Sequence, residues 1–448
     1  MNSSKATNPF PDWLNPIVVK ELRQGLRSTI FSLTFLLMQA GMLYYTLIVF
    51  TEGNSVRELF WFMLSLLFLL VIPFRGVGVL NDEIRDNTLD LLLLTELSPR
   101  RIIFGKWLAL ALQSFLMIVT ILPYVVLTYF TGDGNLVSEL LTLGSLFIGG
   151  IIVTTLMMQI PQSARPLSFV LVPLVFFVGA ISSSFFFRRS GISVVDWMGF
   201  LFMGALLALY VAMCLENVAG RITPPGINTT LGKRLLAALF LAMGAACAMP
   251  PGMFLLLLLA ASPVVLGILC EAPTPLASLY LPPKRLRHTL AGRWTMPFLY
   301  PGSASGLLWF TALLGGMGAI LVARDSDCTR LFLLLEAAGT LLIPLLLLRL
   351  LRIRRLILLS IILQAAIFLI AILLRTRHGH DPTFSGAITL PPFGFWNYLF
   401  SSQPTLVHAD NSLLLPGSIL AAVLAICFVI DYRQWRTIRE LQATLQTA

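Results

Sequence analysis

Most of the chain consists of apolar runs separated by short polar segments. A helix needs about 20 apolar residues to cross a hydrocarbon core about 30 Å thick. Inside lipid the backbone must satisfy its own hydrogen bonds, which favours helices over the shorter, alternating strands of a barrel. The pattern predicts an all-α polytopic membrane protein with about 12 transmembrane helices. We place them near residues 30–50, 59–80, 107–130, 140–160, 167–187, 197–215, 235–249, 253–270, 306–323, 332–348, 356–374 and 412–430.

The span count depends on the apolar stretch 235–270, which "AMPPGM" interrupts. If the stretch were one span, the C-terminal half would be inverted and would carry eleven bases outside against four inside. Short cytoplasmic loops are normally enriched in Lys and Arg. We therefore expect a hairpin of two helices that turns at Pro250 and Pro251.

The charges predict the orientation and the domain organisation. With both termini cytoplasmic, the inner segments hold 23 of the 31 Lys and Arg, and the outer segments hold 7. The expected parts are a cytoplasmic N-terminal segment (1–29), a six-helix membrane block (30–215), a cytoplasmic linker (216–234), a second six-helix membrane block (235–430) and a cytoplasmic tail (431–448).

The segment "NPIVVKELRQGLR" before the first span predicts an amphipathic helix along the inner membrane surface. Asn15 can cap it, and Pro16 suits its first position. Apolar Leu14, Val18, Leu22 and Leu26 recur every four residues. The candidate residues are Pro16, Val18, Lys20, Glu21, Leu22, Arg23 and Arg27. A simple basic anchor for anionic lipid is the alternative interpretation.

A second amphipathic segment, 81–107, lies between the second and third predicted spans. In a helix, Glu83, Asp86 and Asp90 would share a narrow arc, with apolar residues nearly opposite. An acidic arc has the wrong charge for anionic headgroups, so it favours contact with a protein. Ser98 and Pro99 then predict the start of a new helix. The alternative is a solvated charged loop.

These two segments, in this order, resemble the permease subunits of ABC-2-type ATP-binding cassette transporters. "NPIVVKELRQGLRS" is similar to the cytoplasmic helix of that family. "EIRDNTLDLLLLTELSPRRIIFGKWLA" is similar to its E-x-x-x-G-T-L-E-x-L-L-x-T-P-L-S pattern, which a Gly-Lys pair follows. Asn87 replaces glycine, Asp90 replaces glutamate and Glu96 replaces proline. The resemblance covers about residues 10–130.

The resemblance implies a permease that is coupled to a separate ATP-binding subunit. The implied coupling residues are Glu83, Asp86, Asn87, Thr88, Leu89, Asp90, Leu92, Thr95, Leu97, Ser98, Gly105 and Lys106. Further expected partners are the lipid bilayer and a second copy or second permease. The family has about six spans, so the second block is either a fused, diverged half or an added membrane domain.

Composition supports this assignment and excludes several chemistries. Of 448 residues, 57% are hydrophobic and 12% are charged, about half the charged share of a typical soluble domain. The net charge of +10 reflects the cytoplasmic loops, so nucleic acid is not an expected partner. The five cysteines are scattered, without a CxxC motif. "GINTTLGKR" departs from the phosphate-binding loop in spacing and lacks its Ser or Thr. We expect no cofactor and no catalytic residues.

Two minor features remain. His378, His380 and His408 lie in the predicted outer segment 375–411, where a solvated loop is favoured over a metal site. Arg75 and Glu336 each lie near a membrane interface, so both are expected to extend their charged groups to it.

The sequence thus predicts an export permease in the cell inner membrane, with ATP hydrolysis in a separate subunit. An ion-coupled secondary transporter and a membrane scaffold or assembly factor that transports nothing are the alternatives.

Overall fold

The structure is a computed structural model, and it contains helices and no strand in the ranges it describes. These ranges are residues 16–52, 57–76, 98–131, 136–159, 197–224, 228–246, 251–271, 298, 300–324, 329–351, 359, 362–364, 366, 367, 370 and 414–447. The chain divides into two compact units, Met1–Phe200 and Leu201–Ala448. Each is considered by itself.

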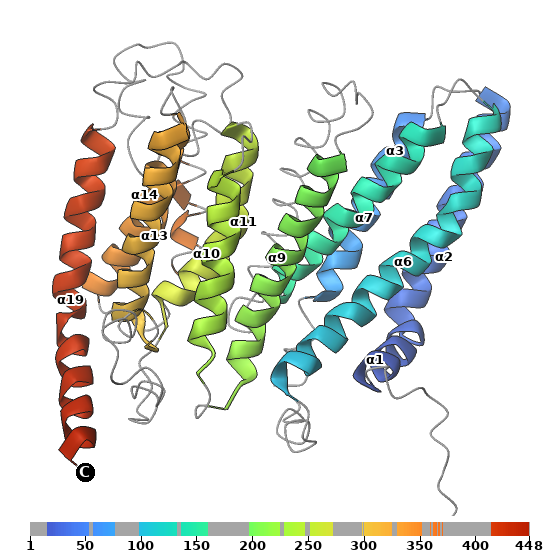
Figure 1. Ribbon diagram of the computed structural model, residues 1–448. Helices are drawn as coiled ribbons and strands as arrows, with labels where there is room; N and C mark the ends of the chain where they lie inside the picture. The colour runs from blue at the N-terminus through green and yellow to red at the C-terminus, as the bar shows by residue number, and fades with distance from the viewer. Residues whose placement is uncertain are drawn as a thin grey trace, which may run out of the picture. The chain divides into compact units, whose positions relative to one another are not determined.

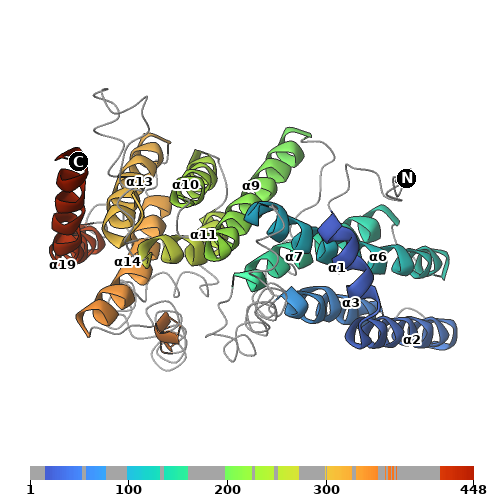
Figure 2. The ribbon, with the colours of Figure 1, turned by 90° about the horizontal axis from the view of Figure 1, so that it is seen from below.

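Unit 1 is built around a long helix, α6, against which α1, α2 and α7 pack (Figures 1 and 2). Its elements are α1 (Pro16–Leu26), α2 (Thr29–Glu52), α3 (Arg57–Leu66), the π-helical turn η2 (Leu67–Val71), α6 (Pro99–Thr131) and α7 (Leu136–Met158). The core is apolar and continuous across α2, α3, η2, α6 and α7. Phe60, Leu64 and Phe68 lie at its centre, and Tyr45 of α2 contacts Phe60 with ring centroids 4.5 Å apart.

Unit 2 is a bundle in which α10 and α11 pack against each other and both contact α13. Its elements are α9 (Trp197–Ile222, which begins four residues before the unit boundary), α10 (Thr230–Ala246), α11 (Pro251–Leu269), α13 (Ser303–Arg324), α14 (Thr329–Leu350) and α19 (Leu414–Thr447). α14 packs against α11, α13 and α19. The predicted linker 216–234 is partly helical, because α9 continues to Ile222 and α10 begins at Thr230.

Three helix starts follow the local sequence rules. Prolines occupy the first positions of α1, α6 and α11, at Pro16, Pro99 and Pro251, where the missing N–H disrupts no helical hydrogen bond. Asn15, the expected cap of α1, lies outside the described residues. The apolar stretch 235–270 is two helices that pack against each other, as its prolines predicted.

Six helices in the described part of the chain are long and apolar enough to cross a membrane. They contain the segments Thr29–Ile48, Pro99–Leu127, Glu139–Met158, Gly204–Ile222, Ser303–Ala323 and Arg330–Leu350. Shorter apolar helices cover Phe60–Gly76, Leu257–Leu269 and Pro416–Tyr432. The chain is therefore a helical protein with the features of a multi-pass membrane protein. The total of twelve spans stays a prediction, since 167–187 and most of 356–374 lie outside the described residues.

Candidate functional site

The amphipathic helix α1 buries its apolar face against α6. Ile17 and Val18 are buried, and Leu22 and Leu26 are half-buried. The opposite face carries exposed Lys20 and Arg23, and Arg27, which follows the end of α1, is also exposed. The predicted division into two faces is confirmed, and the structure adds that the surface covering the apolar face is another helix of the same unit.

A salt bridge joins α1 to α6. Lys106 Nζ donates to Glu21 Oε1 at 2.9 Å, and the Lys106 side chain is only 3% exposed against 21% for Glu21. Removing one partner of a buried pair is strongly destabilising, because the other charge stays in a medium of low polarity. This contact therefore fixes the position of α1 along α6.

Gln113 of α6 is a second link between the helices. Its Oε1 accepts a hydrogen bond of 2.6 Å from Arg75 Nη1, while its amide nitrogen lies against Gly25 of α1. A Cβ at Gly25 would lie 2.1 Å from that nitrogen, so any other residue there would force the Gln113 side chain to move. The Arg75 guanidinium also lies 5.4 Å from the ring centre of Phe31 in α2. We call the set Glu21, Gly25, Arg75, Lys106 and Gln113 the α1–α6 junction.

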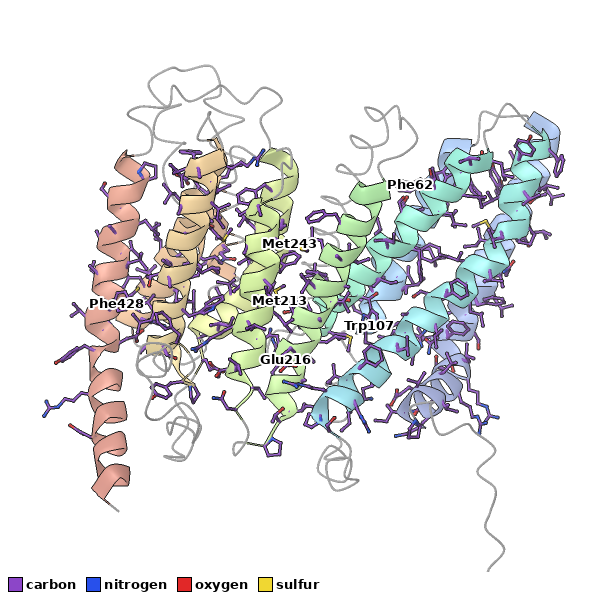
Figure 3. The ribbon with its side chains drawn as sticks, in the orientation of Figure 1. Phe62, Trp107, Met213, Glu216, Met243 and Phe428 are labelled. Carbon is purple, nitrogen blue, oxygen red and sulfur yellow. The ribbon has the colours of Figure 1, made fainter. Side chains whose placement is uncertain are left out.

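The two ends of segment 77–97 are attached to the same framework. Before the segment, Gly76 lies against α7, where an added Cβ would come within 3.1 Å of the Thr154 carbonyl oxygen. After it, α6 begins at Pro99 and carries Trp107 (Figure 3), whose Nε1 donates to Thr155 Oγ1 of α7 at 3.0 Å. The helix before the segment is therefore held by α6 and α7, and the helix after it, α6, is held by α1 and α7.

The structure describes three of the predicted coupling residues, Ser98, Gly105 and Lys106. Ser98 is exposed and its carbonyl accepts the first backbone hydrogen bond of α6, from Ile102 at 3.2 Å. Gly105 is buried, and Lys106 belongs to the junction. The others lie outside the described residues: Glu83, Asp86, Asn87, Thr88, Leu89, Asp90, Leu92, Thr95 and Leu97.

Unit 2 contains a separate buried cluster of charges at the end of α11. Glu271 accepts from Arg234 at 3.2 Å and lies 3.5 Å from Lys233, both of α10. Arg234 is 1% exposed and also donates to the carbonyl oxygens of Phe298 and Gly302. The cluster joins α10, the end of α11 and the start of α13.

A second arginine ties α14 and α19 to the same end of α11. Arg349 donates to Asp431 Oδ2 at 2.7 Å and to the Leu269 carbonyl oxygen at 2.8 Å. A cation at a helix C-terminus is favourable because the last carbonyls carry partial negative charge. With its charges paired inside, this cluster is structural in character.

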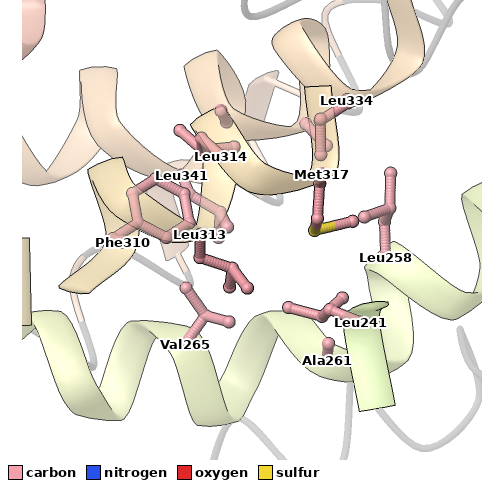
Figure 4. Close-up of a pocket in the computed structure, with 12 residues that line it drawn as sticks. Leu241, Leu258, Ala261, Val265, Phe310, Leu313, Leu314, Met317, Leu334 and Leu341 are labelled. Carbon is pink, nitrogen blue, oxygen red and sulfur yellow. The ribbon is translucent and has the colours of Figure 1, made fainter. Parts of the chain in front are cut away.

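A cavity among the described helices of unit 2 is too small to hold a substrate. It has a volume of about 30 Å³ and lies among α10, α11, α13 and α14 (Figure 4). Leucines, alanines, Val265, Phe310 and Met317 line it. A space of this size could hold about one water molecule, and its walls offer hardly any polar partners for one.

The structure bears on the two side chains, Glu336 and Arg75, that were expected to extend their charged groups to a membrane interface. Glu336 of α14 is 0% exposed, so the expectation that its carboxylate reaches the interface is wrong. The apolar helix bundle encloses the side chain before it can extend. Arg75 is half-buried, and its guanidinium contacts Gln113 and Phe31 within unit 1.

No metal centre is found among the described residues, where no three His, Cys, Asp or Glu side chains group closely enough to hold an ion. His378, His380 and His408 lie outside those residues.

No protein-family model, curated protein or solved structure matches the chain. The site is therefore interpreted from its own residues and from the pattern in the sequence.

The sequence interpretation included Glu21 and Lys106 separately but missed their pairing, and it missed Gly25 and Gln113 entirely. A usable signal was present for the pair. Glu21 is an acid in a helix whose other charged residues are basic, and Lys106 is a base at the start of a mostly apolar span. For Gln113, a polar amide in the middle of an apolar span indicates a hydrogen-bonding partner nearby.

Proposed function

We propose that the chain is the membrane-spanning permease subunit of an ABC-2-type exporter in the cell inner membrane. ATP would be hydrolysed by a separate subunit. Segment 82–98 would be the coupling element that contacts this subunit. The chain itself would carry no catalytic residues.

The observation that supports the proposal best is the attachment of the helices around segment 77–97. The α1–α6 junction and the contacts with α7 hold α1, the end of the Phe60–Gly76 helix and the start of α6 together. A coupling element transmits force only if its two ends are fixed to the helices that must move. This arrangement would pass a displacement of the segment to three helices at once.

The resemblance in sequence supplies the second support. The part of the chain that resembles the family pattern contains Glu83 and Asp86, which would lie on the acidic arc if the segment is helical. When nucleotide binding closes an ATPase dimer, a rigid element seated in it can transmit the movement to the membrane helices. The apolar positions Leu89 and Leu92 would pack against the groove or the spans.

The test is charge reversal at the acidic arc. We would co-express the chain with any ATP-binding subunit that a neighbouring reading frame encodes, purify the complex and measure co-purification and ATPase activity. For the double variant Glu83→Lys with Asp86→Lys, we expect loss of the complex or at least a ~10-fold loss of stimulated ATPase activity, because like charges repel across such a contact.

The matched control is Asp381→Lys with Asp410→Lys, which makes the same change of charge in the predicted outer segment. The control should leave both readouts unchanged. Wild-type behaviour of the Glu83 and Asp86 variant would remove the coupling assignment. Failure of the wild-type chain to bind any ATPase would remove the proposed function as a whole.

An ion-coupled secondary transporter is the second candidate, and Glu336 favours it. Its side chain is fully buried within the apolar span Arg330–Leu350, and ionisable groups enclosed in membrane spans often belong to ion pathways. Transport that persists without ATP, collapses with an ionophore and is abolished by Glu336→Gln would favour this candidate over the exporter.

A further inference from the structure

The apolar helix Phe60–Gly76 changes its hydrogen-bonding pattern in the middle of its length, at η2. Directly after η2, the N–H of Ile72 donates to the carbonyl of Leu67, five residues earlier. At the same spacing, the carbonyl of Phe68 would accept from position 73, where proline has no N–H. Pro73 therefore leaves the Phe68 carbonyl without a donor from its own helix in this pattern.

Two glycines of α7 face this turn. An added Cβ at Gly150 would lie 2.9 Å from the Phe68 carbonyl oxygen, and one at Gly149 would lie 3.1 Å from Leu69 Cδ2. The N–H groups in this part of α7 bond within α7, because it is a regular helix there. The helix Phe60–Gly76 can therefore bend at the Phe68 carbonyl without breaking a hydrogen bond of its own, and π turns and prolines are the usual places where helices bend.

The two sides of η2 are anchored in different ways. Phe60 and Leu64 of α3 are at most 3% exposed and lie in the apolar core of unit 1, where close packing resists displacement. Residues 72–76, after the turn, are tied to α6 by the hydrogen bond from Arg75 to Gln113. A long arginine side chain has many rotamers, so it can keep this bond while the backbone that carries it moves.

We propose that η2 and Pro73 form a hinge, on which residues 72–76 tilt while α3 stays fixed in the core. Ile72, next to the turn, is itself a core residue and is displaced least, so the displacement grows towards Arg75. The end of the helix can then follow α6, to which Arg75 ties it, without repacking α3. The inference goes beyond the proposed transport function and does not depend on it.

A proline inside a helix does not make such a hinge by itself. Pro123 lies inside α6 and Pro344 inside α14, and each of these helices is a single continuous α-helix. Pro73 differs because it follows a π turn, and because glycines of the neighbouring helix face that turn. π turns inside α-helices occur frequently at functional sites. Pro123 therefore serves as the matched control for Pro73.

The experiment places one fluorine reporter on each side of the turn. Phe62 of α3 is 54% exposed, and Phe74, beyond the turn, is 37% exposed. Each is replaced separately by trifluoromethylphenylalanine in the full chain, and fluorine NMR spectra are recorded in phosphatidylcholine nanodiscs. We expect two interconverting resonances from the reporter at position 74 and a single resonance from the reporter at position 62.

Two variants change the turn, and each has a control. Pro73→Ala supplies the missing N–H, so the reporter beyond the turn should lose its second resonance, with a melting temperature at or above that of wild type. Gly150→Ala adds a methyl group against the Phe68 carbonyl and should change the ratio of the two resonances. The controls are Pro123→Ala in α6 and Gly144→Ala in α7, where no described heavy atom lies within 4 Å of the added Cβ. Both should keep the wild-type spectrum.

A single resonance at position 74 in the wild type would overturn the proposal, because the turn would then be a fixed kink. So would two resonances that persist in Pro73→Ala, an unchanged ratio in Gly150→Ala, or a changed spectrum in either control. Two resonances at position 62 as well would show that the whole helix moves as one body, which also overturns the hinge. The charge-reversal test of the coupling segment is independent of all these results, so a failure of the hinge is distinguishable from a failure of the proposed function.

Discussion

Single glycines determine how closely some helices of this protein approach. Gly306 of α13 lies against the backbone of α11, where an added Cβ would be 2.6 Å from the Ile268 carbonyl oxygen. Unlike the side chain that faces Gly25, a backbone carbonyl cannot rotate away. Gly316, further along the same helix, has no heavy atom within 4 Å of the position a Cβ would take.

We predict that Gly306→Ala lowers the free energy of unfolding by about 1–3 kcal/mol, because the helices must separate to admit the methyl group. Gly316→Ala should leave stability unchanged or raise it slightly, since alanine favours helix. Thermal unfolding in detergent measures both. Equal losses in the two variants would show that helix packing at Gly306 is not responsible.

The Cys270 thiol should be unreactive in the folded protein. Its side chain is only partly exposed at the end of α11, and cysteines in buried, apolar surroundings are unreactive. We expect negligible maleimide labelling of Cys270 at pH 8, rising with pH, and complete labelling after denaturation. Peptide mass analysis distinguishes Cys270 from the other four cysteines. Rapid labelling of the native protein would contradict the burial of this end of α11.

At the scale of elements, the helices were largely predictable and their contacts were not. Helix starts at Pro16, Pro99 and Pro251 follow from local rules that act over a few residues. The pairing of Glu21 with Lys106 joins residues 85 positions apart, and that of Arg349 with Asp431 spans 82. Periodicity identifies a face but not its partner.

The salt bridge of the α1–α6 junction gives a prediction at this scale. Glu21→Gln leaves buried Lys106 without its carboxylate and should lower stability by about 3–5 kcal/mol. Glu21→Leu combined with Lys106→Met should be much closer to wild type, because neither charge then remains. A double-mutant cycle by thermal unfolding measures the coupling. Additive effects of the two single variants would show that the salt bridge does not hold α1 in place.

At the scale of the whole molecule, the chain forms two compact units, and the unit with the family-like pattern also contains the α1–α6 junction. Unit 2 concentrates its buried charges at the end of α11, where Glu271 and the Leu269 carbonyl are held by arginines from two other helices. The sequence could not indicate that the buried charges of unit 2 gather at the end of α11, because charge pairing depends on which helices are neighbours.

The orientation of the whole chain gives the last prediction. Epitope tags at the two termini should be protected in intact spheroplasts, whereas a tag in segment 375–411 should be accessible, because basic loops stay in the cytoplasm. Antibody binding before and after permeabilisation of the spheroplasts measures this. A C-terminal tag exposed on intact spheroplasts would contradict the assignment of α10 and α11 as two separate spans.

The Glu21–Lys106 contact also has a consequence for biosynthesis. Its partners are 85 residues apart, and a chain grows at roughly 5–20 residues per second, so Glu21 is made about 4–17 s before Lys106. During that interval Ile17 and Val18 have no α6 to cover them. Synthesis of α6 therefore sets the earliest moment at which this part of the protein can assemble.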